Sequence, residues 1–505
     1  MRPTRNHRFL SLIQSAITTT LKPELQSDVA RQTADIIQLC LDELKRRERG
    51  TGEVLAAVNR AGAVIAADMA ALLTRRNGVV PAQSDDTADV TNDITALDQR
   101  ITDHDRLSKR LSELGAMLKA SGADEDVMAL LLRAAQWEVR LHCEQLPQAD
   151  SGASEVPYQP PSDAELRDAI ETFVRGQHAD GDRVLVTEFA RVTGGFSKAS
   201  YLLTLRNASG GEEKLVVRKM GREPLIALEA TLIENEFHLL SDVAKTNFPA
   251  PKPLWLGVDV PGVDSNFYIM TRLPGRTIGT FLGGADALPE RFLLDLAEIL
   301  AKLHNYPLET FRAYIDRYDS GAVLSDSVSD WYRRRIAEWR RYAMETDAEF
   351  HLASPMATWL LTWLEGNVAE DRRCPVLLHG DYNIHNFLCE DNRVTGVLDW
   401  ENSMFGAPEH DLAYLRPNIE KHIDWKRFLQ HYRDSGGREV DEGAFDFYLA
   451  FNAMRISFGS NRAVKNLQRG SMSDIRLAAI EFGFLPDFMR TSLERAVAYE
   501  NSQRK

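Results

Sequence analysis

The sequence predicts an α+β protein in which a helical domain is followed by a β-rich lobe and a second helical lobe. Two changes in the spacing of apolar residues support this prediction. Apolar residues recur with helical spacing up to residue 147, alternate with strand spacing between Val184 and Thr271, and recur with helical spacing again after residue 274. We therefore expect four segments, a helical bundle (1–147), a linker (148–162), a β-rich N-lobe (163–273) and a helical C-lobe (274–505).

The first segment shows an apolar face in each of its expected helices, and it contains no chemical motif. These faces predict the core of a helical bundle, which we favour over a ligand pocket. The most apolar stretch, around residues 63–73, is interrupted by Asp68 and is expected to be too short to span a bilayer. A homodimer formed through this domain is a further hypothesis, with no particular residue behind it.

Residues 148–162 are rich in Pro, Ser and Gly, which is typical of an extended linker. A helix over Asp163–Arg175 is expected to open the next segment. Three strands should follow it, at Phe189–Val192, Tyr201–Leu205 and Lys214–Lys219.

The loop between the first two of these strands contains consecutive glycines. Glycine lets the backbone approach a polyphosphate closely, and the N–H groups of such a loop can point at its oxygens. An ordinary hairpin turn is the alternative reading of two glycines. The candidates for phosphate contact in this loop are Gly194, Gly195, Phe196 and Ser197, with Ser197 at the polar tip.

A second loop is expected to gather three oxygen-bearing side chains. A short buried strand at Pro375–Leu378 leads to Asp381, and a tight hairpin then places Asn386 beside Asp399 at its open end. Two hard oxygen ligands suit Mg²⁺, and a third carboxylate suits accepting the proton of a hydroxyl group. This set fits phosphoryl transfer, whereas a lone Asp in such a loop would more often be a solvated carboxylate.

The order of these motifs resembles a known family. His379-Gly380-Asp381, with Asn386 five positions after the Asp, and then Leu398-Asp399-Trp400-Glu401, is similar to the aminoglycoside phosphotransferase and choline kinase superfamily, relatives of the protein kinases. The resemblance covers about residues 165–500 and implies a bilobal protein-kinase-like fold. It implies that Asp381 is the catalytic base, that Asn386 and Asp399 bind the metal, and that the cofactors are ATP and Mg²⁺.

The resemblance also implies a cation at the end of the third strand, where it would hold the α and β phosphates. Neighbouring strand residues face opposite sides, so only one of Arg218 and Lys219 can point into the cleft, and we favour Arg218. Glu236, in a helix expected over 225–243, matches the carboxylate that pairs with this cation. Two other glutamates compete for that role, Glu229 and Glu234.

The hinge and the brace of the catalytic loop are placed by position in the family pattern. A strand expected over Phe267–Thr271 leads to a crossover whose backbone would read the adenine edge. Asp411 is implied to brace the catalytic loop through hydrogen bonds. Eleven residues separate it from Asp399, too few for a long activation loop, which argues against a protein substrate. The hinge candidates are Met270, Thr271 and Leu273.

Composition limits the partners. The net charge of -14 disfavours nucleic acid and anionic membranes. The four cysteines lack metal-ligand spacing and indicate a reducing compartment, and the chain opens on no secretory signal. We therefore expect a cytoplasmic enzyme that acts on a small molecule.

The acceptor is suggested only by the resemblance, which is closest to the phosphotransferases associated with acyl-CoA dehydrogenases. Two basic stretches, Trp331–Tyr342 and Arg455–Ser473, could contact the phosphates of a CoA thioester, although a solvated basic face is the favoured reading of the first. The implied function is ATP- and Mg-dependent phosphorylation of a small-molecule hydroxyl, with a hydroxyacyl-CoA as one candidate. The alternatives are a nucleotide-binding regulatory module without turnover, and an aminoglycoside or amino-alcohol kinase.

Overall fold

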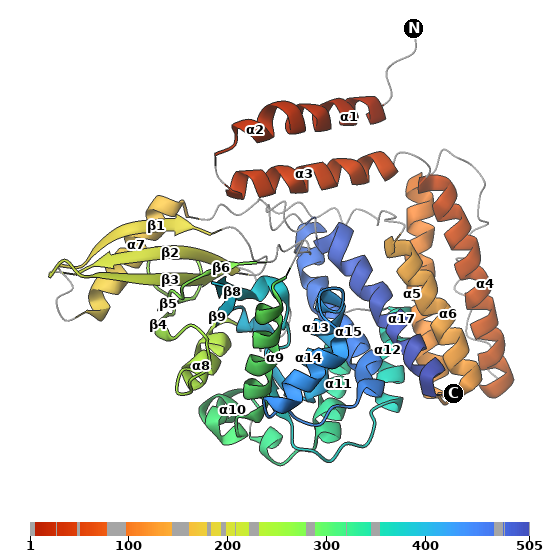
Figure 1. Cartoon of the computed structure of the whole chain (residues 1–505). Helices are drawn as coiled ribbons and strands as arrows, with labels where there is room; N and C mark the ends of the chain where they lie inside the picture. The colour runs from red at the N-terminus through yellow and green to blue at the C-terminus, as the bar shows by residue number, and fades with distance from the viewer. Residues whose placement is uncertain are drawn as a thin grey trace, which may run out of the picture. The chain divides into compact units, whose positions relative to one another are not determined.

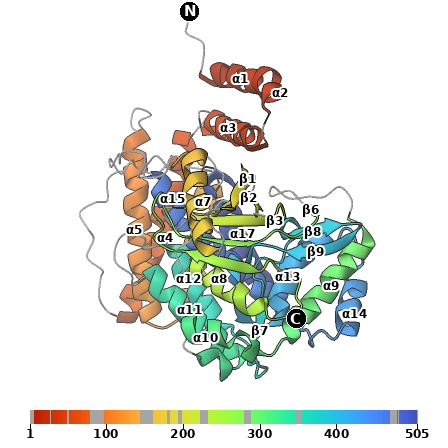
Figure 2. The same ribbon diagram turned by 90° about the vertical axis from the view of Figure 1, so that its left-hand side faces the viewer.

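The computed structural model divides the chain into two compact units, which are described separately (Figure 1 and Figure 2). The mixed unit contains residues Gln159–Arg334 and Ala369–Asn452, and the helical unit contains Met1–Tyr158, Arg335–Val368 and Ala453–Lys505. The structure describes residues 6–26, 28–47, 51–77, 97–143, 161–178, 183–192, 198–207, 209–221, 232–278, 288–319, 321–344, 354–468, 478 and 480–503.

The mixed unit begins with helix α7 (Asp163–Gln177), whose N-terminus is closed by a capping box between Ser162 and Glu165. Five antiparallel strands follow in the spatial order β1-β2-β3-β5-β4, and α7 lies across one face of this sheet (Figure 1). The strands are β1 (Leu185–Arg191), β2 (Lys198–Arg206), β3 (Glu212–Met220), β4 (Pro253–Gly257) and β5 (Phe267–Thr271).

Side-chain parity decides what each face of the sheet holds. Alternate residues of β2, β3 and β5 pack under α7 in a buried core that includes Leu203, Val217 and Ile269. The residues between them face helix α8 (Ile233–Val243), which packs against β4 and β5. Arg218 lies in register with Ser200 and Tyr268 on this second face.

The second half of the mixed unit is helical apart from two small sheets, which flank the candidate catalytic residues. Strand β7 (Val376–Leu378) pairs with β10 (Met404–Gly406), and β8 (Phe387–Glu390) pairs with β6 (Arg276–Thr277) and forms a hairpin with β9 (Arg393–Val397). Asp391 and Asn392 close this hairpin with φ of 49° and 61°, which suits a two-residue turn. The helices of this half are α9 (Glu290–Asn305), α10 (Arg312–Tyr318), α13 (Pro408–Ile419) and α14 (Trp425–Asp434), and α11 (Val328–Met344) and α15 (Phe445–Gln468) contribute residues to both units.

The helical unit differs from the expected N-terminal bundle because helices from later in the chain also contribute to its core. Helices α4, α5 and α6 lie side by side (Figure 1), and α12 packs against α5 and α6 while α17 packs against α6. Residues 335–368 and 453–505, which we expected in the C-lobe, are thus grouped with the N-terminal helices because they bury apolar faces on them. The helices are α1 (Asn6–Ala16), α2 (Lys22–Glu24), α3 (Asp28–Arg47), α4 (Thr51–Asn77), α5 (Leu97–Ala120), α6 (Glu125–Cys143), α12 (Pro355–Gly366) and α17 (Leu485–Gln503).

The fold class predicted from the sequence is confirmed, with a helical N-terminal region, an antiparallel sheet and helices after it. The expected linker falls almost wholly on residues outside the described part of the chain.

Helix α4 corrects one prediction. Its 27 residues are enough to cross a bilayer, and the stretch Gly52–Asn77 has a mean hydropathy of 1.4 in its most apolar window, so the expectation of a short helix was wrong. Asp68 does not end the helix, and its exposed carboxylate pairs with Arg133 of α6 at 2.9 Å. Leu55, Val58 and Met69 are fully buried, and a buried core helix meets the same length and composition test as a membrane span.

A buried carboxylate joins α6 to the start of α12. One oxygen of Glu138 accepts hydrogen bonds from Ser354 Oγ at 2.7 Å and from the Met356 N–H at 2.8 Å. It thereby occupies the N-terminus of α12, where free N–H groups favour an acceptor. Burial nevertheless raises the pKa of Glu138 to about 7, and these two hydrogen bonds oppose the rise only in part.

The Glu138→Gln substitution should therefore change how stability depends on pH. The folded chain holds the Glu138 proton up to about pH 7, whereas the unfolded chain releases it near pH 4.5. Its contribution to the free energy of unfolding is therefore complete below pH 4.5 and is lost as the pH rises through 7, up to about 3 kcal/mol. Gln keeps an acceptor oxygen and does not titrate, so the variant should lose less stability than the wild type between pH 5 and pH 8. Urea unfolding at both pH values measures this, and exposed Glu125→Gln on the same helix should behave like the wild type; an unchanged pH dependence in Glu138→Gln would contradict the prediction.

Candidate active site

The loop that carries Asp381 is held by hydrogen bonds to Asp411, which lies in the first turn of α13. The two oxygens of this buried carboxylate accept hydrogen bonds from the backbone N–H groups of His379 (2.8 Å) and Gly380 (2.9 Å). Gly380 has a φ of 76°, which glycine adopts without strain. Burial acts to raise the pKa of Asp411, but the hydrogen bond from His304 and the neighbouring histidines lower it overall, so that Asp411 is an acceptor.

Asp381 and Asn386 are directly hydrogen-bonded. Asn386 Nδ2 donates to the Asp381 carbonyl at 2.9 Å and to Asp381 Oδ2 at 3.0 Å. The other carboxylate oxygen, Asp381 Oδ1, is buried and has no hydrogen-bond partner among the described residues. A buried acceptor without a partner is costly, so this oxygen is suited to a donor that comes from outside the chain.

Asp399 follows β9 in a left-handed conformation, with φ of 65° and ψ of 66°. The next residue, Trp400, is buried, donates its ring N–H to the Val397 carbonyl at 3.0 Å and packs edge-on against Phe248 and His379. Two hydrogen bonds of 2.8 Å connect Leu398 to the loop. The Leu398 N–H donates to the Asn386 carbonyl, and His379 Nε2 donates to the Leu398 carbonyl. The loop and the hairpin are therefore fixed to one another around the three predicted residues.

Carboxylates crowd around Asp399. Burial raises the pKa of Asp399 to about 7, and the charges of Glu401, Glu236 and Asp381 add to this rise, while Arg218 opposes it. A divalent cation beside Asp399 and Asn386 would remove this repulsion, and both side chains offer the oxygen atoms that Mg²⁺ prefers. The donor set therefore fits a metal that takes its remaining ligands from phosphate and water. Among the described residues, no group of three His, Cys, Asp or Glu side chains forms a metal site.

The structure places Arg218 on the same face as these residues and Lys219 on the other. Arg218 Nε lies 3.1 Å from the Glu236 carboxylate, and its guanidinium also donates to Asp399. Lys219 pairs with Asp264 at 2.6 Å, away from this face. Arg218 is thus the cation that faces Asp399, as the parity argument favoured. The competing Glu234 instead accepts a hydrogen bond from Asn266, and Glu229 lies outside the described residues.

Two charged residues of the site, Lys198 and Glu401, were not predicted from the sequence. Lys198 Nζ lies 2.5 Å from Glu401 and 3.2 Å from Glu236, and its side chain is only 2% exposed. Because the sequence predicted that this strand begins at Tyr201, Lys198 was assigned to the loop before it. In the structure Lys198 is the first residue of β2. Even-numbered residues of β2 share the face of Arg218, so extending the strand by three residues would have placed Lys198 there.

The remaining predicted nucleotide contacts are placed only in part. Gly194, Gly195, Phe196 and Ser197 lie outside the described residues. Met270 and Thr271 end β5, and Leu273 follows them in the crossover. The N–H groups of Thr271 and Arg272 donate to the carbonyls of Lys252 and Lys214, so these two donors are already used within the sheet.

The arginines of α11 are engaged by carboxylates, which supports the reading of this helix as a basic outer face. The side chains of Trp331 and Tyr332 are buried. The ion pairs are Arg333 with Glu370, Arg334 with Asp319 and Asp326, Arg335 with Glu338, and Arg340 with Glu365.

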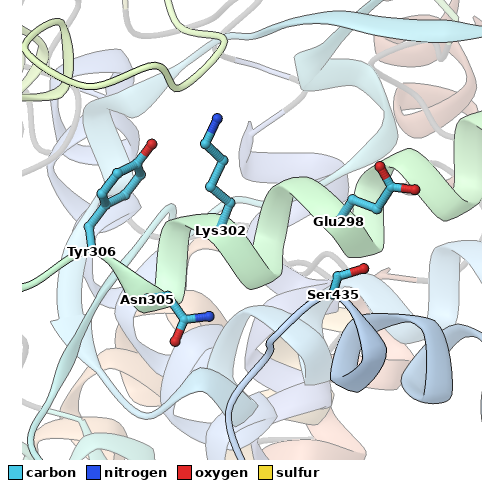
Figure 3. A pocket seen from close by; sticks show the side chains of 5 residues that line it. All are labelled: Glu298, Lys302, Asn305, Tyr306 and Ser435. Atoms are coloured by element: carbon cyan, nitrogen blue, oxygen red, sulfur yellow. The ribbon is translucent and has the colours of Figure 1, made fainter.

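A separate pocket of about 530 Å³ lies along α9, at the residues shown in Figure 3. Lys302 and Tyr306 extend to the same side of the helix. Lys302 donates a hydrogen bond to the backbone carbonyl of Asn247, and the Tyr306 hydroxyl donates one to the Asn247 side chain. None of the predicted site residues lines this pocket. Its lining residues are Glu298, Lys302, Asn305, Tyr306 and Ser435.

Comparison with known proteins places this geometry in a family. Residues 188–448, just over half of the chain, match the model of the phosphotransferase enzyme family, APH. The chain belongs to this family. The matched part begins in β1, ends in α15 and contains every site residue described above.

Relatives of the chain include two longer proteins. Acyl-CoA dehydrogenase family member 11 of Gallus gallus is 30% identical over 256 residues, which cover 48% of this chain and 31% of the relative. Acyl-CoA dehydrogenase family member 10 of Mus musculus is 26% identical over 328 residues, covering 58% and 27%. The chain thus spans about a third or less of the length of these relatives. Among solved structures, macrolide 2'-phosphotransferase MphH from Brachybacterium faecium is 19% identical, with a TM-score of 0.37 and coverage of 61% of this chain and 99% of that one.

Proposed function

We propose that this phosphotransferase moves the terminal phosphoryl group of ATP to a hydroxyl group of a small molecule. One observation carries the proposal, the buried and unpartnered Asp381 Oδ1 beside Asn386. A side chain held in this way can accept the hydrogen bond of an acceptor hydroxyl and then its proton. A regulatory module that only binds nucleotide gains nothing from keeping such an oxygen buried and unsatisfied.

The proposed reaction assigns a role to each charged group. Asp381 orients the hydroxyl and takes its proton as the hydroxyl oxygen forms a bond to the γ-phosphorus and the bond to the β-phosphate oxygen breaks, releasing ADP. Asn386 and Asp399 would hold Mg²⁺, which when bound neutralises charge on the phosphate oxygens. Arg218, oriented by Glu236, supplies a cation for the nucleotide phosphates.

A hydroxyacyl-CoA is the acceptor that we propose first. The support is that the matching parts of two relatives belong to proteins named as members of the acyl-CoA dehydrogenase family. This name indicates an acyl thioester as the substrate of those proteins. The α11 arginines give this proposal no support, because their carboxylate partners already balance their charge. Amino alcohols and aminoglycosides are the competing acceptors.

An acceptor screen tests the proposed function. We expect ATP consumption that depends on Asp381 with at least one compound from a panel of hydroxyacyl-CoAs, sugars, amino alcohols and aminoglycosides. Asp391→Asn, which removes an exposed carboxylate from the tip of the β8–β9 turn, is the matched control and should keep full activity. ATP binding without Asp381-dependent ADP release for any compound would favour the regulatory module.

A further inference from the structure

Five charged side chains form one cluster in the mixed unit, and all of them except the partly exposed Asp399 are buried. Glu236 is shared by two cations, Lys198 at 3.2 Å and Arg218 at 3.1 Å. Glu401 lies 2.5 Å from Lys198 and 3.6 Å from Arg218, and Arg218 also donates to Asp399. The cluster therefore contains two positive and three negative groups.

Lys198 connects three segments whose relative positions matter for the proposed reaction. It is the first residue of β2, directly after the glycine loop, whereas Glu236 lies on α8 and Glu401 follows Asp399 by two residues. Two ion pairs with a side chain that is 2% exposed therefore hold three elements at one point. Buried pairs of this kind fix geometry because leaving either partner alone is costly.

We propose that Lys198 is a positioning residue that neutralises Glu236 and Glu401 and so leaves Arg218 available to the nucleotide. Without Lys198, Arg218 would be the only cation of this cluster facing three carboxylates, and it would be drawn from the phosphates towards Glu236 and Glu401. Lys198 acts through these neighbours and does not contact the nucleotide. This inference rests on the proposed function, because it assigns Arg218 to the phosphates.

The charge arithmetic of the cluster gives a sharp test. Lys198→Met should raise the Kd for MgADP, measured by titration calorimetry, by about 10-fold or more, because one cation is left with three carboxylates. The double variant Lys198→Met with Glu401→Gln has one cation and two carboxylates, the same net charge as the wild type. It should restore the Kd to within about 3-fold of the wild type.

A neighbouring lysine supplies the control. Lys219→Met removes a buried cation from the other face of the same sheet, where Lys219 pairs with Asp264. It should lower the Tm without changing the Kd for MgADP, which separates a general loss of stability from the effect of Lys198. If Lys198→Met does not fold, the double variant alone decides, because the net charge of its cluster equals that of the wild type.

Three results would overturn the inference. A double variant that binds as weakly as Lys198→Met would make Lys198 a direct ligand of the nucleotide, and a normal Kd with a lowered Tm in Lys198→Met would make its role purely structural. A wild-type chain that binds no MgADP would overturn the proposed function and this inference with it. Wild-type binding together with either of the first two results would overturn only the role of Lys198.

Discussion

The Asp381→Asn variant is expected to lose about 10²–10⁴-fold in kcat while it binds MgATP almost as the wild type does, because a positioned general base contributes a factor of this size to proton transfer. Asn keeps the shape of the side chain and can still accept the hydrogen bond that Asn386 donates. It cannot take the proton of the acceptor hydroxyl. Steady-state kinetics with the acceptor found in the screen, together with titration calorimetry for MgATP, measures both quantities.

The separation between the two measurements is what identifies the role of Asp381. Full activity in Asp381→Asn would show that another group accepts the proton. A parallel loss of kcat and of MgATP affinity would instead place Asp381 in the binding of the nucleotide. The Asp391→Asn control, in the turn of the neighbouring β8–β9 hairpin, excludes a general effect of one lost negative charge.

The Asp399→Asn variant is expected to bind MgATP about 100-fold more weakly or worse, since a metal ion stabilises phosphate charge by several kcal/mol. Asn is the appropriate replacement because residue 399 has a φ of 65°, which Asn and Asp tolerate better than Ala. Ala would add backbone strain to the loss of the ligand and would confuse the two effects. Titration calorimetry at several Mg²⁺ concentrations measures the change.

Increasing the Mg²⁺ concentration should recover part of this lost affinity, because the neutral amide oxygen is a weaker ligand than a carboxylate but is still a ligand. Equal losses of MgATP affinity in Asp381→Asn and Asp399→Asn would show that the roles of base and metal ligand are assigned wrongly. A loss that does not respond to Mg²⁺ would show that Asp399 acts mainly as the partner of Arg218.

Much of the mixed unit could be predicted because local patterns determine it. Strand β5 occupies the expected residues Phe267–Thr271, and the β8–β9 hairpin forms around the expected turn. Parity along β3 was enough to predict that Arg218 and Lys219 lie on opposite faces. These features depend on residues that are close together in sequence, where spacing is informative.

What the sequence did not reveal depends on long-range packing. Lys198 and Glu401 are 203 residues apart in the chain, and each alone has the appearance of a surface charge. The grouping of α12 and α17 with the N-terminal helices likewise arises from apolar faces that have no sequence signal for their partner. Helix α4 was judged too short to span a bilayer because only its most apolar stretch was considered, whereas the helix runs from Thr51 to Asn77.

The left-handed backbone of Asp399 also limits how this position can change over evolution. A β-branched or bulky residue there would strain the turn after β9, so the substitutions open to a descendant that loses catalysis are mainly Asn and Gly. An inactive homologue should therefore carry one of these two residues at the position of Asp399, while Trp400 stays in place to keep the buried packing against Phe248.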